Sequence, residues 1–243
     1  KDGNVVPLEK GPLALDLHGG PHGAVTGFFY RPHYYLLNKG YIIVNLAFSG
    51  SVGYGQNHID ALPGQIGIKD AEEVKATLDY ILENKMADPN KLLVMGGSYG
   101  GYFTGLMIAK YPTLFKCAVI YNPVINIPFN AVTTDIPDWS YFEVFNTEMI
   151  LEPTSEHFKK MWEYSPVSMN RDIKSSVLLM VGGKDQRCPP QQSIHYYKVL
   201  KQKGVDVTFY YYPDEGHSLA GDLYVRMDDF VKFMNFIDEK MPK

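Results

Sequence analysis

Three side chains of this 243-residue chain could together carry out nucleophilic acyl transfer: a serine, an aspartate and a histidine, each close to glycine. Ser98 stands in the sequence Gly-Gly-Ser-Tyr-Gly-Gly, Asp185 in Gly-Gly-Lys-Asp and His217 in Asp-Glu-Gly-His. A serine hydroxyl is a weak nucleophile at neutral pH, so it needs a histidine base, and that base needs an acid to orient it. The residue types and their chain order therefore predict hydrolysis through an acyl-enzyme intermediate.

The segment around Ser98 has the form Gly-x-Ser-x-Gly and lies between two regular elements. The apolar run 91–95 before it reads as a strand, and the run 102–111 after it reads as a helix. A strand that enters a helix through this motif forms a nucleophile elbow, whose turn strains the serine and whose glycines let strand and helix pass closely. We therefore expect Ser98 at the end of a sheet with its hydroxyl exposed.

Strand-like and helix-like runs alternate along the chain. The strand-like runs are almost continuously apolar, which is typical of strands buried on both faces of a parallel sheet. This alternation predicts an α/β-hydrolase fold, a doubly wound and mostly parallel sheet with helices on both faces. The predicted strands cover residues 13–17, 41–46, 92–95, 118–121, 177–181 and 207–212, and the predicted helices cover residues 31–38, 70–85, 102–111, 190–203 and 223–239.

Asp185 and His217 each follow a predicted strand, 177–181 and 207–212 respectively. Right-handed crossovers bring the carboxyl ends of parallel strands to one edge of the sheet, so both loops fall where Ser98 should emerge. Ser98, Asp185 and His217 are therefore the predicted catalytic residues.

Three other acidic side chains near His217 in the sequence are less suited to be its partner. Asp214 and Glu215 precede the histidine too closely to reach its Nδ1 atom from a separate loop. Asp206 lies at the opposite end of the predicted strand. The sequence therefore favours Asp185 as the acid.

A tetrahedral intermediate carries an oxyanion, which needs two donors already directed at it. The amide of Tyr99, the residue after the nucleophile, is the first predicted donor. The second should come from the loop after the strand 13–17, which reads His-Gly-Gly-Pro-His-Gly. We assign it to the amide of Gly20, with Gly19 as the alternative.

His18 and His22 in that loop are four residues apart, a spacing that could suggest a metal. The Gly-Gly-Pro between them prevents a helix, and the sequence offers no evident third ligand, so we expect them to order the loop. The predicted chemistry requires no metal or organic cofactor.

Two further features could shape a substrate site. Arg187 follows Asp185 by two residues and could bind a substrate carbonyl or product carboxylate, or it could stabilise its loop through a salt bridge. The aromatic-rich segment 123–166 is too long for a simple connection. It predicts an inserted lid or pocket wall, the alternative being extra helices that pack on the side of the domain.

Length and composition predict one α/β domain over residues 1–243, because 45% hydrophobic residues suffice for a sizeable core. A net charge of −4 and scattered basic residues give no reason to expect nucleic acid or a membrane surface as partner. No apolar run approaches the roughly 18–20 residues of a membrane span. A buried thiol is expected at Cys117 rather than a disulfide with Cys188, which fits a cytoplasmic protein.

The beginning of the chain has no apolar segment of the kind found in signal peptides. It starts with lysine and looks cut from a longer polypeptide, and residues 5–8 read like the tail of an earlier strand. An ordinary ragged terminus is the alternative.

With these residues placed, the chain resembles the catalytic domain of the prolyl oligopeptidase family of serine peptidases from about residue 13 to residue 237. The wider family is suggested by His-Gly-Gly-Pro at 18–21, Gly-Tyr-Gly-Gln at 53–56, the serine motif at 96–101 and Asp-Gln-Arg-Cys-Pro at 185–189. The more selective blocks, Asn-Pro-Val-Ile-Asn-Ile at 122–127 and Thr-Asp-Ile-Pro-Asp-Trp at 134–139, resemble its acylaminoacyl-peptidase branch. Cys188 stands where the family often carries valine, a change that conserves size.

The resemblance implies release of an N-acyl amino acid from a short, N-acylated peptide. An acylated terminus carries no charge, so an apolar pocket with amide contacts should suffice, and Trp139, Tyr141 and Phe142 are expected in its wall. The resemblance also implies a β-propeller domain before the hydrolase, which the given sequence does not include. Three alternatives stay open: a propeller joined in cis before residue 1, a propeller supplied in trans, or no propeller in this protein. The sequence does not determine the oligomeric state, and a homo-oligomer is one of the open alternatives.

Two other functions stay open at this point. A carboxylesterase or lipase would use the same three residues and the same oxyanion donors, although the blocks at 122–127 and 134–139 favour the peptidase. A non-catalytic binding domain of hydrolase form would usually lack the serine or the histidine, and this chain has both.

Overall fold

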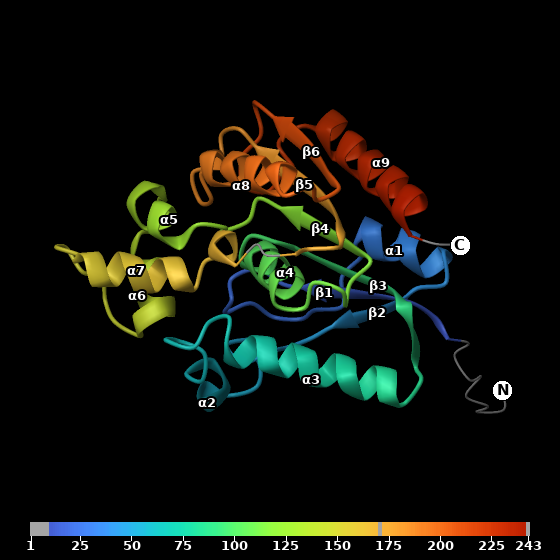
Figure 1. The fold of residues 1–243 in the computed structure, drawn as a ribbon, viewed down its shortest axis with the longest axis horizontal. Helices are drawn as coiled ribbons and strands as arrows, with labels where there is room; N and C mark the ends of the chain where they lie inside the picture. The colour runs from blue at the N-terminus through green and yellow to red at the C-terminus, as the bar shows by residue number, and fades with distance from the viewer. Residues whose placement is uncertain (1–9, 170–171, 242–243) are drawn as a thin grey trace.

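A six-stranded parallel sheet forms the centre of the described structure (Figure 1). The computed structural model describes residues 10–169 and 172–241, so the strand tail expected at residues 5–8 lies outside the described residues. The strand order is β2-β1-β3-β4-β5-β6. The strands are β1 (Gly11–Leu17), β2 (Ile42–Asn45), β3 (Ala87–Gly97), β4 (Cys117–Tyr121), β5 (Ser176–Gly182) and β6 (Val207–Tyr212).

Helices cover both faces of this sheet, and the predicted doubly wound α/β architecture is confirmed. Helices α1 and α9 pack on one face, and α3, α4 and α8 pack on the other (Figure 1). The helices are α1 (Arg31–Asn38), α2 (Gln56–Ile59), α3 (Lys69–Glu83), α4 (Tyr99–Lys110), α5 (Ile127–Thr133), α6 (Asp138–Phe145), α7 (Ser155–Glu163), α8 (Pro190–Gln202) and α9 (Leu223–Lys240).

Alternate residues of the central strands enter two different cores, which explains their almost continuous apolar character. In β3, Leu92 and Val94 belong to the core beneath α3 and α4, whereas Leu93 and Met95 belong to the core beneath α1 and α9. All four side chains are buried. A strand covered on both faces has no solvent-facing side, so it shows no polar alternation.

The turn from β3 into α4 holds Ser98 in a backbone conformation that non-glycine residues rarely adopt, with φ 59° and ψ −122°. Helix α4 starts so close to the end of β1 that a methyl group at Gly100 would overlap the Leu17 carbonyl oxygen. A Cβ at Gly96 would lie 2.5 Å from the Gly100 backbone. Glycine is therefore required where these three backbone segments meet. Helix α4 begins at Tyr99, earlier than predicted, because this packing overrides the low helix propensity of glycine.

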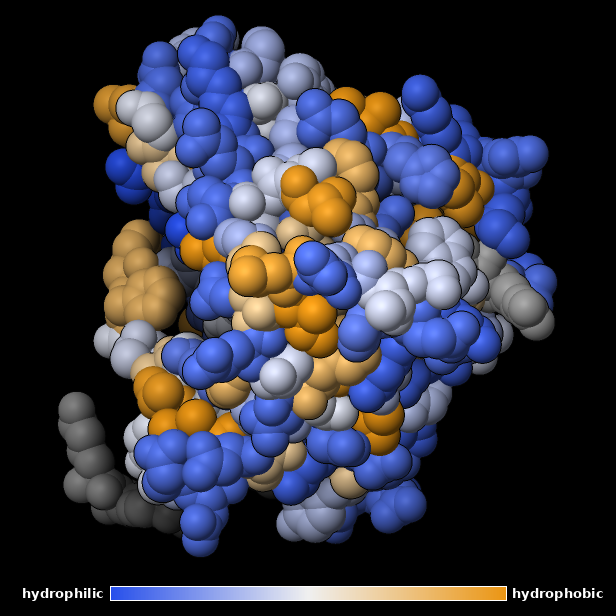
Figure 2. Space-filling model, turned by 90° about the vertical axis from the view of Figure 1, so that its left-hand side faces the viewer, coloured by the Kyte–Doolittle hydropathy of each residue, from blue (hydrophilic) through white to orange (hydrophobic). Residues whose placement is uncertain are grey.

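The segment 123–166 folds into helices α5, α6 and α7 at one end of the molecule, on the left in Figure 1. Figure 2 views the molecule from this side and shows apolar side chains gathered among charged ones. The exposed large apolar residues of the segment are Val132, Phe142, Met149, Leu151 and Trp162. The segment thus supplies extra helices, and one of them, α6, places Trp139 with its ring centroid 6.1 Å from that of Tyr99.

Both cysteines are buried free thiols, as the sequence predicted for Cys117. Burial raises the pKa of the Cys117 thiol to about 12, so this group stays protonated at neutral pH. In the part of the chain that the structure describes, no helix combines the length and apolarity needed to cross a bilayer.

We expect Gly100→Ala to destabilise the fold by about 3 kcal/mol, because the new methyl group overlaps the Leu17 carbonyl oxygen and the backbone must move. Gly27→Ala is the matched control, since a Cβ there meets no atom within 4 Å, and it should change stability by less than about 1 kcal/mol. Urea denaturation followed by circular dichroism measures both. Equal urea midpoints for the Gly100→Ala and Gly27→Ala variants would contradict the requirement for glycine at position 100.

Candidate active site

Ser98 lies at the carboxyl edge of the sheet, where two cavities meet. Its amide donates to the carbonyl oxygen of Tyr121 at the end of β4, at 3.0 Å. A cavity of 140 Å³ and another of 540 Å³ both include Ser98 in their linings, and they share no other lining residue. The half-buried serine is therefore approached from two directions.

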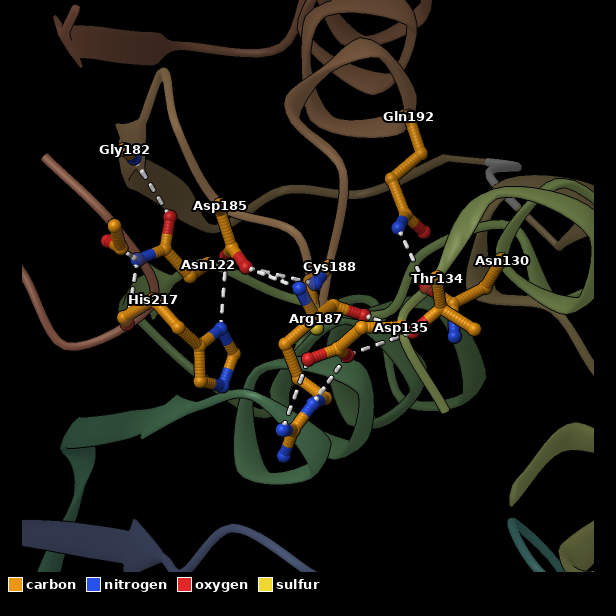
Figure 3. Close-up of polar contacts among 11 residues, drawn as sticks. Asn122, Asn130, Thr134, Asp135, Gly182, Asp185, Arg187, Cys188, Gln192 and His217 are labelled. Carbon is orange, nitrogen blue, oxygen red and sulfur yellow. Dashed lines mark hydrogen bonds and ion pairs between the residues drawn. The ribbon is translucent and has the colours of Figure 1, made fainter. Parts of the chain in front are cut away.

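The imidazole of His217 lies next to the carboxylate of Asp185, with His217 Nδ1 2.8 Å from Asp185 Oδ2 (Figure 3). The other carboxylate oxygen, Oδ1, accepts the amides of Arg187 and Cys188 at 2.8 and 2.9 Å. The Asp185 side chain is 0% exposed and that of His217 is 32% exposed. Because both carboxylate oxygens have partners, the orientation of the imidazole is fixed, and its Nε2 atom is left as the acceptor of the neutral ring. Ser98 and His217 line the same cavity of 540 Å³.

A buried asparagine that was not among the predicted site residues ties the Asp185 and His217 loops together. Asn122 Oδ1 accepts the amide of Gly182 at 2.7 Å, and its Nδ2 donates to the carbonyl of His217 at 2.7 Å (Figure 3). Asn122 has φ 38°, in the left-handed region that asparagine tolerates better than most residues. Its position directly after a strand, at the same sheet edge, is the signal that could have identified it.

The other acidic residues near His217 in the sequence have partners elsewhere. Asp214 is exposed and pairs with Lys184 at 2.8 Å. Glu215 is buried and accepts two backbone amides of the loop that follows, at 2.8 and 3.1 Å. Asp206 lies at the opposite end of β6. Among the described residues, none of these three is placed to orient the imidazole of His217.

The loop after β1 passes directly over the Ser98 turn. A Cβ at Gly19 would lie 3.4 Å from the Cβ of Ser98, and Gly20 lines the smaller cavity together with Tyr99. Gly20 has φ 121°, which favours glycine, and its carbonyl oxygen accepts the indole N–H of Trp139 at 3.0 Å. Both glycines considered as oxyanion donors are thus close to Ser98, and the tryptophan holds the peptide group that follows Gly20.

The two histidines of this loop each contact a distant part of the chain. His22 Nδ1 donates to the carbonyl of Gly50 at 2.8 Å, and its Nε2 lies 3.1 Å from the buried carboxylate of Glu143 in α6. Contact with this carboxylate raises the pKa of His22, whereas burial raises the pKa of Glu143. His18 Nε2 is 2.8 Å from the hydroxyl of Ser51. These contacts connect the loop to α6 and to the loop after β2.

Behind the Ser98 turn, the hydroxyl of Tyr99 donates a hydrogen bond to Asp70 in the first turn of α3. Asp70 is 0% exposed, and burial raises its pKa to about 7. Its Oδ1 atom accepts the amide of Ala71 at 2.8 Å. The ring of Tyr99 also stacks on Tyr102 at a centroid distance of 5.1 Å. The residue that follows Ser98 is therefore anchored through its side chain to a third element, a contact that the sequence did not predict.

The cavity of 140 Å³ beside Ser98 has a largely apolar wall. It is lined by Gly20, Ser98, Tyr99, Val124, Asn130, Ile136, Trp139, Arg187 and Cys188. Trp139 lies where the aromatic wall was expected, but Tyr141 and Phe142 are absent from the lining. Tyr141 is buried in the core and Phe142 is partly exposed near His22, because successive residues of a helix point about 100° apart.

Arg187 forms a salt bridge, which was one of its two expected roles. Its Nε and Nη2 atoms contact the carboxylate of Asp135 at 2.7 and 3.1 Å (Figure 3). The guanidinium holds the pKa of Asp135 below its ordinary value. Arg187 also lines the cavity of 140 Å³, so the salt bridge positions a guanidinium beside Ser98 rather than removing it from the site.

The thiol of Cys188 packs against the site. Burial raises the pKa of this thiol well above the ordinary value, so it stays neutral. Its sulfur lies within 4.8 Å of side-chain atoms of both Asp185 and His217. The sequence analysis noted only that Cys188 replaces a valine of similar size and did not predict this contact with the site.

Comparison with known proteins places the chain in a family. Residues 28–243 match the prolyl oligopeptidase family. The chain belongs to this family. Acylamino-acid-releasing enzymes from Arabidopsis thaliana and Homo sapiens are 35% identical over 226 residues and 34% identical over 224 residues. The alignments cover 92% and 90% of this chain but 29% and 30% of those relatives, so the chain spans less than a third of their length.

Solved structures of acylaminoacyl peptidases have the same fold as this chain. An acylaminoacyl peptidase from Pyrococcus horikoshii superimposes with a TM-score of 0.85 at 28% identity, covering 97% of this chain and 38% of that chain. An acylaminoacyl peptidase in complex with Z-Gly-Gly-Phe-chloromethyl ketone superimposes with a TM-score of 0.85 at 29% identity, covering 100% and 38%. The predicted α/β-hydrolase fold and family resemblance are confirmed.

The raised pKa of Asp70 makes the stability of this prolyl oligopeptidase family member depend on pH. Between about pH 4 and pH 7 the unfolded chain releases the Asp70 proton and the folded protein keeps it, so stability falls as the pH rises. Asp70→Asn cannot ionise. We expect it to gain about 1–4 kcal/mol of stability relative to wild type between pH 4.5 and pH 7.5.

The control for this measurement is Glu83→Gln, which removes an exposed carboxyl group at the end of the same helix. It should show no comparable gain when urea denaturation is repeated across the same pH range. A stability difference between Asp70→Asn and wild type that does not change with pH would contradict the raised pKa.

Proposed function

We propose that this protein is a serine peptidase that releases N-acyl amino acids from short, N-acylated peptides. The observation that carries the proposal is the 2.8 Å contact of His217 Nδ1 with the buried carboxylate of Asp185, beside Ser98 at a strand–helix turn. Membership of the prolyl oligopeptidase family and the similarity to acylamino-acid-releasing enzymes support this class of reaction.

In the proposed mechanism, Ser98 Oγ attacks the carbonyl carbon of the acylated residue while His217 Nε2 takes the hydroxyl proton. Asp185 keeps Nδ1 protonated and stabilises the imidazolium. The oxyanion accepts hydrogen bonds from the amides of Tyr99 and Gly20. The imidazolium then protonates the leaving nitrogen and the C–N bond breaks. Water, deprotonated by the same imidazole, hydrolyses the acyl-enzyme ester, which releases the N-acyl amino acid and restores the serine.

The cavity of 140 Å³ suits the acylated residue. Val124, Ile136 and Trp139 supply apolar walls, and the described lining contains no carboxylate that would hold a free ammonium group. Arg187, which is already oriented by Asp135, has N–H groups left to donate to the acyl carbonyl. A neutral, acylated amino terminus is therefore the form of substrate that this cavity favours.

We also propose that a further domain covers the face shown in Figure 2. The aligned relatives continue well beyond the matched region, which covers 29% and 30% of their length. Exposed apolar side chains of α5–α7 and their loops lie on this end of the molecule. The family resemblance points to a β-propeller, in cis or in trans, that limits access to short peptides. Two unpaired thiols suit a cytoplasmic location.

We expect Ser98→Ala to lower hydrolysis of acetyl-amino-acid anilides by at least about 10³-fold, because only the serine hydroxyl can form the acyl-enzyme. Steady-state kinetics measure the loss, and circular dichroism checks that the variant is folded. A fluorophosphonate probe should label the wild type and should not label this variant. Ser155→Ala, an exposed serine in α7, is the matched control. A Ser98→Ala rate within about tenfold of wild type would refute the serine as nucleophile.

The same kinetics separate a peptidase from a carboxylesterase. The proposed peptidase hydrolyses acetylated peptides and anilides, whose leaving nitrogen must be protonated, in addition to simple aryl esters. Hydrolysis of aryl esters with no turnover of acetylated peptides would identify an esterase instead.

We expect Arg187→Gln to lower kcat/KM for acetylated substrates about tenfold, because a charge-assisted hydrogen bond to the acyl carbonyl is lost. The loss should appear mainly in KM. Asp135→Asn breaks the same salt bridge but keeps the guanidinium, so its loss should be smaller. Equal losses in the two variants would show that the salt bridge only supports the loop.

A further inference from the structure

The cavity of 540 Å³ beside Ser98 has no role in the mechanism above. Its volume falls within the range of about 300–1,000 Å³ that is typical of ligand pockets. It lies between the first halves of α1 and α9, which pack together on one face of the sheet (Figure 1). Its lining is largely apolar and aromatic, with Met95, Leu219 and Phe230 among these residues. The charged lining residues are Asp16, Arg31, Arg226 and Asp229.

The two cavities divide the substrate at Ser98. His217 must protonate the leaving nitrogen, so the leaving peptide lies on the imidazole side of the scissile bond. His217 lines the cavity of 540 Å³, whereas Tyr99 and Gly20, the proposed oxyanion donors, line the cavity of 140 Å³. The acylated residue therefore fits the small cavity, and the leaving peptide fits the large one.

Three of the charged side chains that line the large cavity have partners: Asp16 pairs with a histidine, and Asp229 and Arg31 pair with each other. Asp16 is 2.6 Å from His33 Nε2, and Asp229 Oδ1 is 3.9 Å from Arg31 Nη2. Arg226 lines the same cavity from α9 and is exposed. Its guanidinium forms no ion pair or hydrogen bond with residues 10–169 or 172–241. Arg226 also attracts the carboxylate of Asp229, but without a hydrogen bond, so its N–H groups are left to donate to a ligand. A guanidinium with free donors in a peptide-sized cavity matches the fork geometry of a carboxylate.

We propose that the cavity between α1 and α9 binds the leaving peptide, and that Arg226 binds the free C-terminal carboxylate of that peptide. The inference rests on the proposed function and narrows its substrate class. The substrates are N-acylated peptides short enough for their carboxylate to reach Arg226 while the scissile carbonyl lies at Ser98. Each residue of the leaving peptide adds at most about 3.6 Å, so the preference for a free carboxylate has an optimum length.

The test compares acetyl-alanyl peptides that end in one, two or three glycines, each as the free acid and as the C-terminal amide. The assays use the protein as its cell makes it, with acetyl-alanine anilide as a substrate that has no leaving peptide. We expect wild type to prefer the acid over the amide by about tenfold in kcat/KM at the optimum length. Arg226→Gln should lower kcat/KM for that acid about tenfold and bring acid and amide to the same value.

Lys201→Gln is the matched control, because it removes one exposed positive charge from the last turn of α8, at the amino-terminal side of β6. It should keep the preference for the acid. The inference is overturned if wild type shows no such preference at any length, or if Arg226→Gln lowers acid and amide equally. If neither the anilide nor any peptide is hydrolysed, the proposed function itself is wrong and the inference falls with it.

Discussion

The close approach of helix α4 to the end of strand β1 is the constraint on which the rest of the site depends. Only glycine at position 100 leaves room for the Leu17 carbonyl oxygen, and Gly96 faces the same crowding from the other side. Because the backbone segments are pressed together here, the turn between them is sharp and Ser98 takes a left-handed φ of 59°. The serine is thereby carried to the edge of the sheet instead of into either core.

The strained turn is held by contacts of Tyr99 and of the loop after β1, both of which border the smaller cavity. Tyr99 reaches through the core to Asp70, and Trp139 of α6 donates to the carbonyl of Gly20 in the loop above. A loop and two helices that are distant in the sequence are thus joined around one turn. This arrangement suits a site in which amide donors must point in fixed directions before a substrate arrives.

The parallel sheet brings the other two side chains to Ser98, and a single asparagine fixes their spacing. All six strands run in the same direction, so the loops after β4, β5 and β6 emerge at one edge. Asn122, at the end of β4, can therefore bond both the Gly182 amide and the His217 carbonyl. The two cavities beside Ser98 differ for a related reason. Trp139 of the inserted helix α6 lines the smaller one, whereas α1 and α9 contribute charged side chains to the larger one.

The sequence by itself determined the strands, the main helices, the Ser98 turn and the loops of Asp185 and His217. These are local signals: apolar runs, glycines at a turn and residues that directly follow a strand. Only the tertiary structure decided which side chains from distant segments meet. It decided that Asn122 bonds the loops of Asp185 and His217 and that Asp70 accepts a hydrogen bond from Tyr99. It also decided that Glu143 contacts His22 and that Asp135 pairs with Arg187. It also turned Tyr141 and Phe142 away from the cavity that Trp139 lines. These contacts depend on how each helix is rotated about its axis and on which distant segments pack together. Local sequence patterns determine neither.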